Sequence, residues 1–89
     1  NNIEGSEFHL FVVSKKKIDN KINDIIIKYF GTFALPKKIY YLSEMPKTRS
    51  GKILRRVLRN YLVDKKLKNI GDLSTMLNKN IIKELRLIN

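Results

Sequence analysis

The chain has 89 residues, so it forms one small domain or part of one, and a large multidomain catalytic machine is excluded. Its formal net charge of +11, from 19 Lys and Arg against 8 Asp and Glu, favours polyanionic partners without choosing among phosphates, nucleic acid and anionic membrane. Hydrophobic residues make up 43% of the chain, which is enough for a packed core and argues against wholesale disorder.

Composition excludes several kinds of site. The absence of cysteine removes disulfides, thiolate metal sites and cysteine nucleophiles, and the single histidine, His9, cannot build a metal site alone. No spacing of Ser, His and Asp specifies a catalytic triad. Apolar runs are only a few residues long, so no segment is expected to span a bilayer. The chain begins without Met and without the layout of a signal peptide, and we interpret it as a segment of something longer.

The first half of the chain predicts a strand, a helix and a second strand. Residues 8–13 are rich in aromatic and β-branched side chains, which predicts a strand mostly buried on both faces. In residues 19–30 apolar side chains recur at three- and four-residue spacing, which predicts an amphipathic helix with Asp19 as its N-cap and Gly31 as a left-handed residue after its end. Residues 38–42 predict the second strand, and a loop follows it.

The second half predicts two helices. Residues 51–63 carry an apolar stripe at helical period with Lys and Arg on the opposite side, which predicts a cationic amphipathic helix. Asn78 is expected to cap a last short helix. We therefore predict an α+β fold, with a small incomplete domain in residues 1–65 and a C-terminal tail in residues 66–89. Two strands make a marginal sheet, so the first elements of the domain are expected to be missing.

Residues 46–59, PKTRSGKILRRVLR, contain six basic residues and no acidic one. Because Ser50 and Gly51 stand at the predicted helix start, free backbone amides and the positive end of the helix dipole would face an anion beside Lys52. Gly51 would also permit close approach of the backbone to that anion. A Walker A loop is rejected, because proline and isoleucine occupy places where that motif needs Gly and Ser or Thr. Spacing alone leaves open the default interpretation, in which Lys52 and the arginines behind it are solvated surface charges.

The stretch LSEMPKTRSGKILRRVLR, followed by GDLSTM, closely resembles the C-terminal domain of AMP-forming acetyl-CoA synthetases, which belong to the adenylate-forming superfamily. The resemblance runs from about Glu7 to the end of the chain. It implies a small mobile lid domain whose Lys52 reaches into a large N-terminal domain and contacts the acyl carboxylate and the α-phosphate. It also implies that Arg49, Ser50 and Gly51 take part in nucleotide binding. Chemistry agrees, because a positioned ammonium lowers the barrier where a carboxylate meets a phosphate.

The same resemblance implies a reaction, cofactors and partners. Acetate and MgATP would give acetyl-adenylate and pyrophosphate, and CoA would then give acetyl-CoA and AMP, with ATP, Mg²⁺ and CoA bound mainly by the large domain. Lys28, beside Ile27 at the place where some relatives carry an arginine, is expected to contact the CoA phosphate. A protein acetyltransferase and a deacetylase are expected to remove and restore the charge of Lys52. We expect a cytoplasmic enzyme, with the nucleus as a second location, no metal ligands in this chain, and no nucleic-acid or membrane partner.

Three alternatives stay open from the sequence. Because the acyl pocket would lie outside this chain, a propionyl-CoA synthetase is the nearest one. The charge alone permits a free-standing module that binds nucleic acid or an anionic membrane, and a passive interaction domain is the third. In a nucleic-acid module Tyr40, Tyr41 and Tyr61 could stack on bases, but their places in a strand and on an apolar stripe indicate core positions.

Overall fold

The computed structural model describes residues 8–88 of the chain and has the predicted α+β character. In chain order its elements are β1 (His9–Val13), α1 (Asp19–Phe30), the short 3-10 helix η2 (Thr32–Ala34), β2 (Lys38–Leu42), α2 (Arg55–Val63) and α3 (Asn80–Leu87). They form two compact units, Asn1–Tyr41 and Leu42–Asn89. The expected boundary between residues 65 and 66 falls inside the second unit, where hydrogen bonds such as that from Arg56 to the carbonyl of Ile70 cross it.

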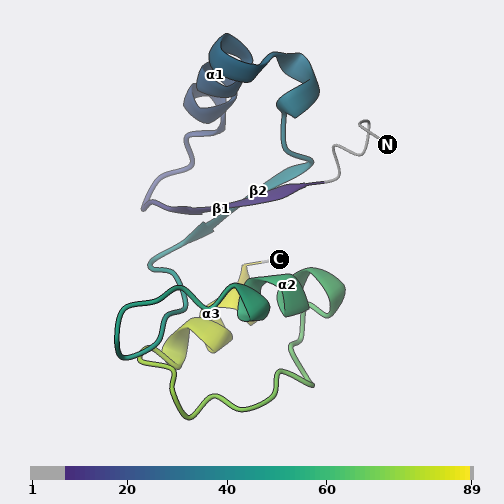
Figure 1. The fold of residues 1–89 in the computed structure, drawn as a ribbon. Coiled ribbons are helices and arrows are strands. Elements are labelled where there is room, and N and C mark those ends of the chain that lie inside the picture. The colour runs from purple at the N-terminus through teal and green to yellow at the C-terminus, as the bar shows by residue number, and fades with distance from the viewer. Residues whose placement is uncertain (1–7, 89) are drawn as a thin grey trace. The chain divides into compact units, whose positions relative to one another are not determined.

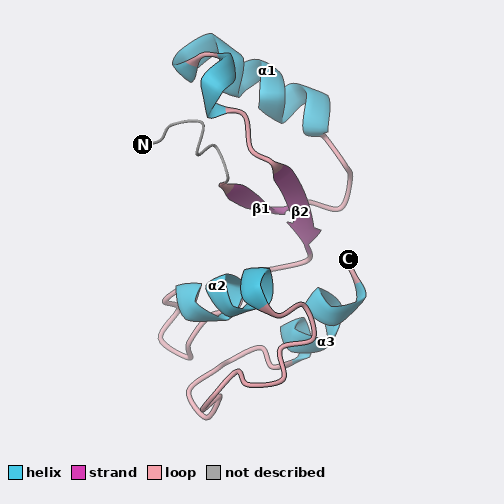
Figure 2. Ribbon diagram, turned by 90° about the vertical axis from the view of Figure 1, so that its right-hand side faces the viewer, coloured by secondary structure: helices cyan, strands magenta, loops and turns pink. Residues whose placement is uncertain are grey.

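The first unit is a strand, a crossover helix and a second strand. The amide of Lys37 donates to the carbonyl of Phe8 at 2.9 Å, which pairs the beginnings of the two strands, so β1 and β2 run in the same direction. A parallel pair needs a long crossover connection, and α1 with η2 supplies it. Figures 1 and 2 both show α1 and η2 on one side of the strand pair.

Burial in the first unit centres on β2. Tyr40 is 3% exposed and stacks on the rings of His9 and Phe11, with centroids 5.8 and 4.9 Å away, which confirms its expected core position. Four residues of β1, His9–Val12, are partly buried, in keeping with a strand that is mostly buried, whereas Val13 at its end is 51% exposed. Among the described residues of this unit, the regular elements besides β1 are β2, α1 and the short η2.

The start of α1 is held by a tyrosine from β2. The Tyr41 hydroxyl accepts a hydrogen bond from the amide of Ile18 at 2.9 Å and donates to the carboxylate of Asp19. Partial desolvation and the bond to Asp19 raise the pKa of Tyr41 above its ordinary value. Asp19 is therefore the first helical residue and not the N-cap, which is Ile18. Gly31 ends the helix with φ of 92°, as its predicted left-handed role requires.

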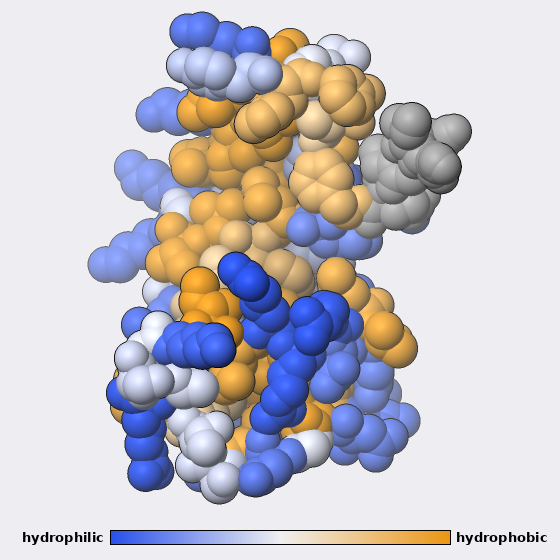
Figure 3. Space-filling model, in the orientation of Figure 1, coloured by the Kyte–Doolittle hydropathy of each residue, from blue (hydrophilic) through white to orange (hydrophobic). Residues whose placement is uncertain are grey.

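The outer face of α1 is apolar and exposed. No residue of α1 is fully buried, although its apolar stripe predicted a core-facing helix. The side chains of Ile25, Tyr29, Phe30 and Phe33 are each more than half exposed. Figure 3 shows apolar side chains gathered over this unit on the face that it draws. Exposed apolar patches of this kind are typical of surfaces that contact another protein part.

The second unit holds most of the buried side chains. Its buried apolar residues include Leu42, Val57, Tyr61, Leu67, Met76, Ile81, Ile82 and Leu85. Val57 and Tyr61 confirm the predicted apolar stripe of α2, and the buried face of α3 confirms the last helix. A long loop, residues 64–79, joins these two helices (Figure 2). Within residues 8–88, no helix combines the length and the apolar character needed to cross a bilayer.

Candidate functional site

The basic motif folds as a hairpin, not as the start of a helix. Residues 46–54, which we call the Lys52 hairpin, pair Lys47 with Ile53 in antiparallel register. The amide of Thr48 donates to the carbonyl of Lys52 at 2.8 Å, and the amide of Gly51 donates back to the carbonyl of Thr48 at 2.9 Å. This bonding belongs to a three-residue hairpin loop whose last residue has a left-handed backbone, and Gly51 has φ of 92°. The loop chemistry of Thr-Arg-Ser-Gly-Lys therefore produces a tight turn that ends at Lys52.

The prediction that a helix begins at Ser50 and Gly51 was wrong. Helix α2 begins at Arg55, four residues after Gly51, so the helix dipole does not start at Ser50. The amides of Gly51 and Lys52 are also occupied, because they donate to the carbonyl and to Oγ1 of Thr48. The hydroxyls of Thr48 and Ser50 lie 2.9 Å apart and bond each other. The two backbone amides that were predicted to face an anion thus donate hydrogen bonds inside the hairpin.

A segment distant in sequence pairs with the hairpin through backbone hydrogen bonds. Residues 70–78, which we call the backing segment, include the GDLSTM motif and lie about 25 residues further along the chain. Met76 pairs with Thr48 in antiparallel register, the amide of Arg49 donates to the carbonyl of Thr75 at 3.1 Å, and the amide of Leu77 donates to the carbonyl of Lys47 at 2.8 Å. The two motifs of the sequence therefore meet in one small β-ladder.

Asn78 joins the same ladder with its side chain. Its Oδ1 accepts a hydrogen bond from the amide of Lys47 at 3.1 Å, and its Nδ2 donates to the carbonyl of Met45 at 2.8 Å. Asn78 was predicted to cap α3, but the N-cap position belongs to Lys79 and no side chain caps that helix. The amide of Asn78 serves the hairpin instead, which no local sequence pattern indicated.

The predicted site residues of the second unit lie together on this hairpin. Arg49, Ser50, Gly51 and Lys52 are all exposed. A shallow concavity of about 390 Å³ beside the turn is lined by Thr48, Arg49, Ser50, Ser74 and Thr75. The exposed side chain of Lys52 therefore follows a turn whose backbone is hydrogen-bonded within the hairpin and to Thr75.

The family of this chain follows from comparison with known proteins. The family model described as the AMP-binding enzyme C-terminal domain matches residues 1–52, more than half of the chain, and its match ends on Lys52. The chain belongs to this family.

Three curated relatives of this AMP-binding enzyme C-terminal domain are acetyl-coenzyme A synthetases. An acetyl-coenzyme A synthetase of Coprinopsis cinerea is 48% identical over 59 residues, which cover 66% of this chain and 9% of the relative. Acetyl-coenzyme A synthetase 2 of Kluyveromyces lactis is 38% identical over 85 residues, covering 92% of this chain and 11% of the relative. The Drosophila melanogaster acetyl-coenzyme A synthetase is 38% identical over 73 residues, which cover 82% of this chain and 11% of the relative. The chain spans about a tenth of the length of these relatives.

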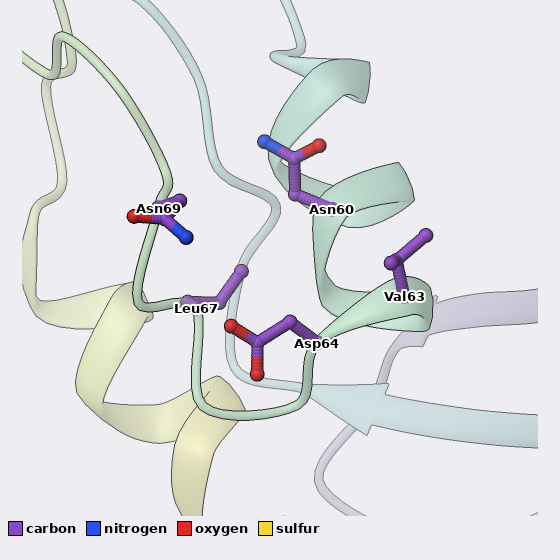
Figure 4. Close-up of a pocket in the computed structure, with 5 residues that line it drawn as sticks. All are labelled: Asn60, Val63, Asp64, Leu67 and Asn69. Atoms are coloured by element: carbon purple, nitrogen blue, oxygen red, sulfur yellow. The ribbon is translucent and has the colours of Figure 1, made fainter.

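A second pocket of the domain lies away from the hairpin. It encloses about 200 Å³ at the end of α2 and is lined by Asn60, Val63, Asp64, Leu67 and Asn69 (Figure 4). The carboxylate of Asp64 accepts hydrogen bonds from the amides of Lys68 and Lys66, at 2.9 and 3.0 Å. These bonds, the one from Lys68 first, hold the pKa of Asp64 below its usual value. Asp64 therefore organises the turn after α2, and its oxygens are engaged by the backbone.

The remaining predicted site residue lies in the other unit of the domain. Lys28 is in the last turn of α1, and its ammonium lies 5.5 Å from the centroid of the Tyr29 ring. Its neighbour Ile27 is 41% exposed. Among residues 8–88 there is no group of three His, Asp or Glu side chains that could hold a metal ion.

Proposed function

We propose that this chain is the mobile C-terminal domain of an AMP-forming acetate–CoA ligase, and that Lys52 supports the first half-reaction, adenylation of acetate. The observation that carries the proposal is the Lys52 hairpin, which presents one exposed ammonium from a turn fixed by the ladder to Thr75 and Met76. The names of the relatives supply the substrate class.

The proposed first half-reaction joins two anions. A carboxylate oxygen of acetate attacks the α-phosphorus of ATP, the new P–O bond forms, and the bond to the bridging oxygen of the β-phosphate breaks as pyrophosphate leaves with its electron pair. Negative charge accumulates on the phosphate oxygens between two groups that repel each other. A positioned ammonium offsets that repulsion, and a flexible side chain with a compact charge suits Lys better than Arg. Lys52 would supply this charge.

The proposed second half-reaction does not need that charge at the same place. The sulfur of CoA attacks the carbonyl carbon of acetyl-adenylate, AMP leaves with the electron pair of the broken C–O bond, and the thiol proton passes to solvent. Lys28 is our candidate contact for a CoA phosphate, since its ammonium sits on the exposed surface of α1. The described residues offer no metal cluster, so we treat Mg²⁺ as part of the MgATP substrate and assign no ligand to it here.

The partner of this domain would be the large N-terminal part of the same enzyme, which binds ATP, acetate and CoA. The exposed apolar side chains of Ile25, Tyr29, Phe30 and Phe33 support such a contact. We also propose reversible acetylation of Lys52, because its side chain is exposed to a protein acetyltransferase and neutralisation would remove the charge that adenylation uses.

The proposal is tested with the full-length protein that the gene encodes. Wild type should release pyrophosphate from ATP only when acetate is present and should form acetyl-CoA and AMP when CoA is added. Lys52→Ala should lower acetate-dependent pyrophosphate release by roughly a hundredfold or more. Lys83→Ala, which removes an exposed lysine of α3, is the matched control and should retain wild-type activity. Faster turnover with propionate would change the substrate, and no pyrophosphate release with either acid would refute the proposed activity.

A further inference from the structure

Arg56, in the first turn of α2, donates two hydrogen bonds to the backbone of the backing segment. Its Nη1 donates to the carbonyl of Ile70 at 2.8 Å, and its Nη2 donates to the carbonyl of Asp72. A planar guanidinium can span two backbone carbonyls with fixed geometry, whereas an ammonium is a single point. Sequence pattern alone predicted Arg56 to be a solvated charge like its neighbour Arg55. The structure leaves Arg55 exposed and makes Arg56 partly buried.

Ile70 and Asp72, which Arg56 binds, precede the residues of the backing segment that pair with the hairpin. The carboxylate of Asp72 accepts hydrogen bonds from the amide of Ser74 at 2.8 Å and from its hydroxyl at 3.1 Å, which fixes the turn into Thr75. Thr75 and the residue after it then pair with Arg49 and Thr48 of the Lys52 hairpin. Every step from Arg56 to the turn before Lys52 is therefore a hydrogen bond or a covalent link.

Arg56 is also close to Lys52 along the chain. Arg56 follows Lys52 by four residues, and the amide of Leu54 between them donates to the carbonyl of Pro46 at 2.9 Å. The hairpin, the first turn of α2, the guanidinium and the backing segment thus form a closed loop of contacts. Releasing the guanidinium opens this loop between α2 and Ile70.

We propose that Arg56 is a positioning residue for Lys52, which it holds in place through the backing segment without touching a substrate. This inference rests on the proposed role of Lys52 in adenylation. Arg56→Lys keeps the positive charge but loses the two-pronged contact, and Arg55→Lys is the matched control on the adjacent exposed arginine. If charge alone mattered, the two variants would behave alike.

The test uses the full-length protein and two independent readouts. The first is amide hydrogen exchange of Thr48 and Gly51, whose amides close the hairpin turn. Because Arg56→Lys loses charge-assisted hydrogen bonds to the backing segment, it should raise these exchange rates roughly tenfold or more, while Arg55→Lys leaves them unchanged. Unchanged exchange in both variants would overturn the proposal that Arg56 holds the hairpin in place, whatever the activity of the enzyme.

The second readout separates positioning from general loss of structure. Arg56→Lys should lower kcat for acetate-dependent pyrophosphate release roughly tenfold, with KM for ATP and acetate within about twofold of wild type. Formation of acetyl-CoA from supplied acetyl-adenylate should stay within about twofold. Equal losses in both half-reactions would mean a purely structural role and overturn the inference. A wild-type protein without acetate-dependent pyrophosphate release would instead refute the proposed function, and the exchange measurement would still decide whether Arg56 holds the hairpin.

Discussion

Replacing Gly51 with alanine tests why a glycine precedes Lys52. Gly51 has φ of 92°, and a Cβ added to it would meet nothing within 4 Å. The added methyl group therefore costs no steric clash with neighbours, and the whole effect comes from the backbone conformation. Holding an alanine in a left-handed conformation costs about 1–2 kcal/mol. Alanine also restricts the unfolded chain, which offsets about 0.4–1 kcal/mol of that cost. We expect a net destabilisation of about 1 kcal/mol.

The matched variant at this position is Gly51→Asn. Asparagine has a larger side chain but enters the left-handed region more readily than alanine, so its strain is smaller. Conformational strain therefore predicts that Gly51→Asn destabilises less than Gly51→Ala. If Gly51 instead served close approach of a ligand to the backbone, the bulkier asparagine would be harmless to folding and worse than alanine for activity.

Urea unfolding of the 89-residue chain measures this difference in the second unit. The methyl NMR signals of Val57 and Leu85 report on that unit, because both side chains are fully buried in it. With a slope of about 1–2 kcal/mol per molar urea, Gly51→Ala should lower the midpoint by roughly 0.5–1 M. An unchanged midpoint for Gly51→Ala, or a larger loss for Gly51→Asn, would refute the strain argument.

Two further measurements probe the packing and the acid sensitivity of the second unit. Leu85→Ala removes a side chain with 0% exposure and should lower the free energy of unfolding in urea by about 2–5 kcal/mol. Leu87→Ala on the same helix, where the side chain is 79% exposed, should lower it by less than about 0.5 kcal/mol. Similar losses in the two variants would contradict the assigned core. The amide and the hydroxyl of Ser74 donate to Asp72 and hold its pKa below the usual value, so its contribution to stability is present above about pH 4 and is lost as pH falls through the lowered pKa. The thermal midpoint of Asp72→Asn should accordingly fall less than that of wild type between about pH 5 and about pH 2, and an identical acid dependence would contradict this role.

Local patterns predicted those elements whose structure is decided by local contacts. The strands near residues 8–13 and 38–42 and the helix over residues 19–30 lie where β-branched runs and three- and four-residue apolar spacing placed them. Gly31 ends α1 with a positive φ because only glycine adopts it without strain. Burial was harder to predict, because the apolar stripe of α1 contains no fully buried residue. An apolar stripe predicts that a face needs a partner, and not that the partner lies within the same unit.

The hairpin was missed although its turn is local, because part of its pairing is with a distant segment. Ile53 and Leu54 fit the helical period of the residues that follow, so the predicted helix started too early, at residue 51. What competes with that helix is the pairing of the hairpin with Met76, more than twenty residues away, and no periodicity encodes that pairing. The same holds for Asn78, whose side chain bonds the hairpin. Lys52 itself was found through the resemblance of its motif, since spacing alone favoured a solvated charge.

The most direct test of the central claim compares the two half-reactions in Lys52→Ala, using the full-length protein in single-turnover experiments. We predict that acetate-dependent formation of acetyl-adenylate and pyrophosphate falls by roughly a hundredfold or more, because the ammonium presented by the hairpin is gone. Formation of acetyl-CoA from supplied acetyl-adenylate should remain within about threefold of wild type. Equal retention of both half-reactions, or equal loss of both, would contradict the assignment of Lys52 to adenylation.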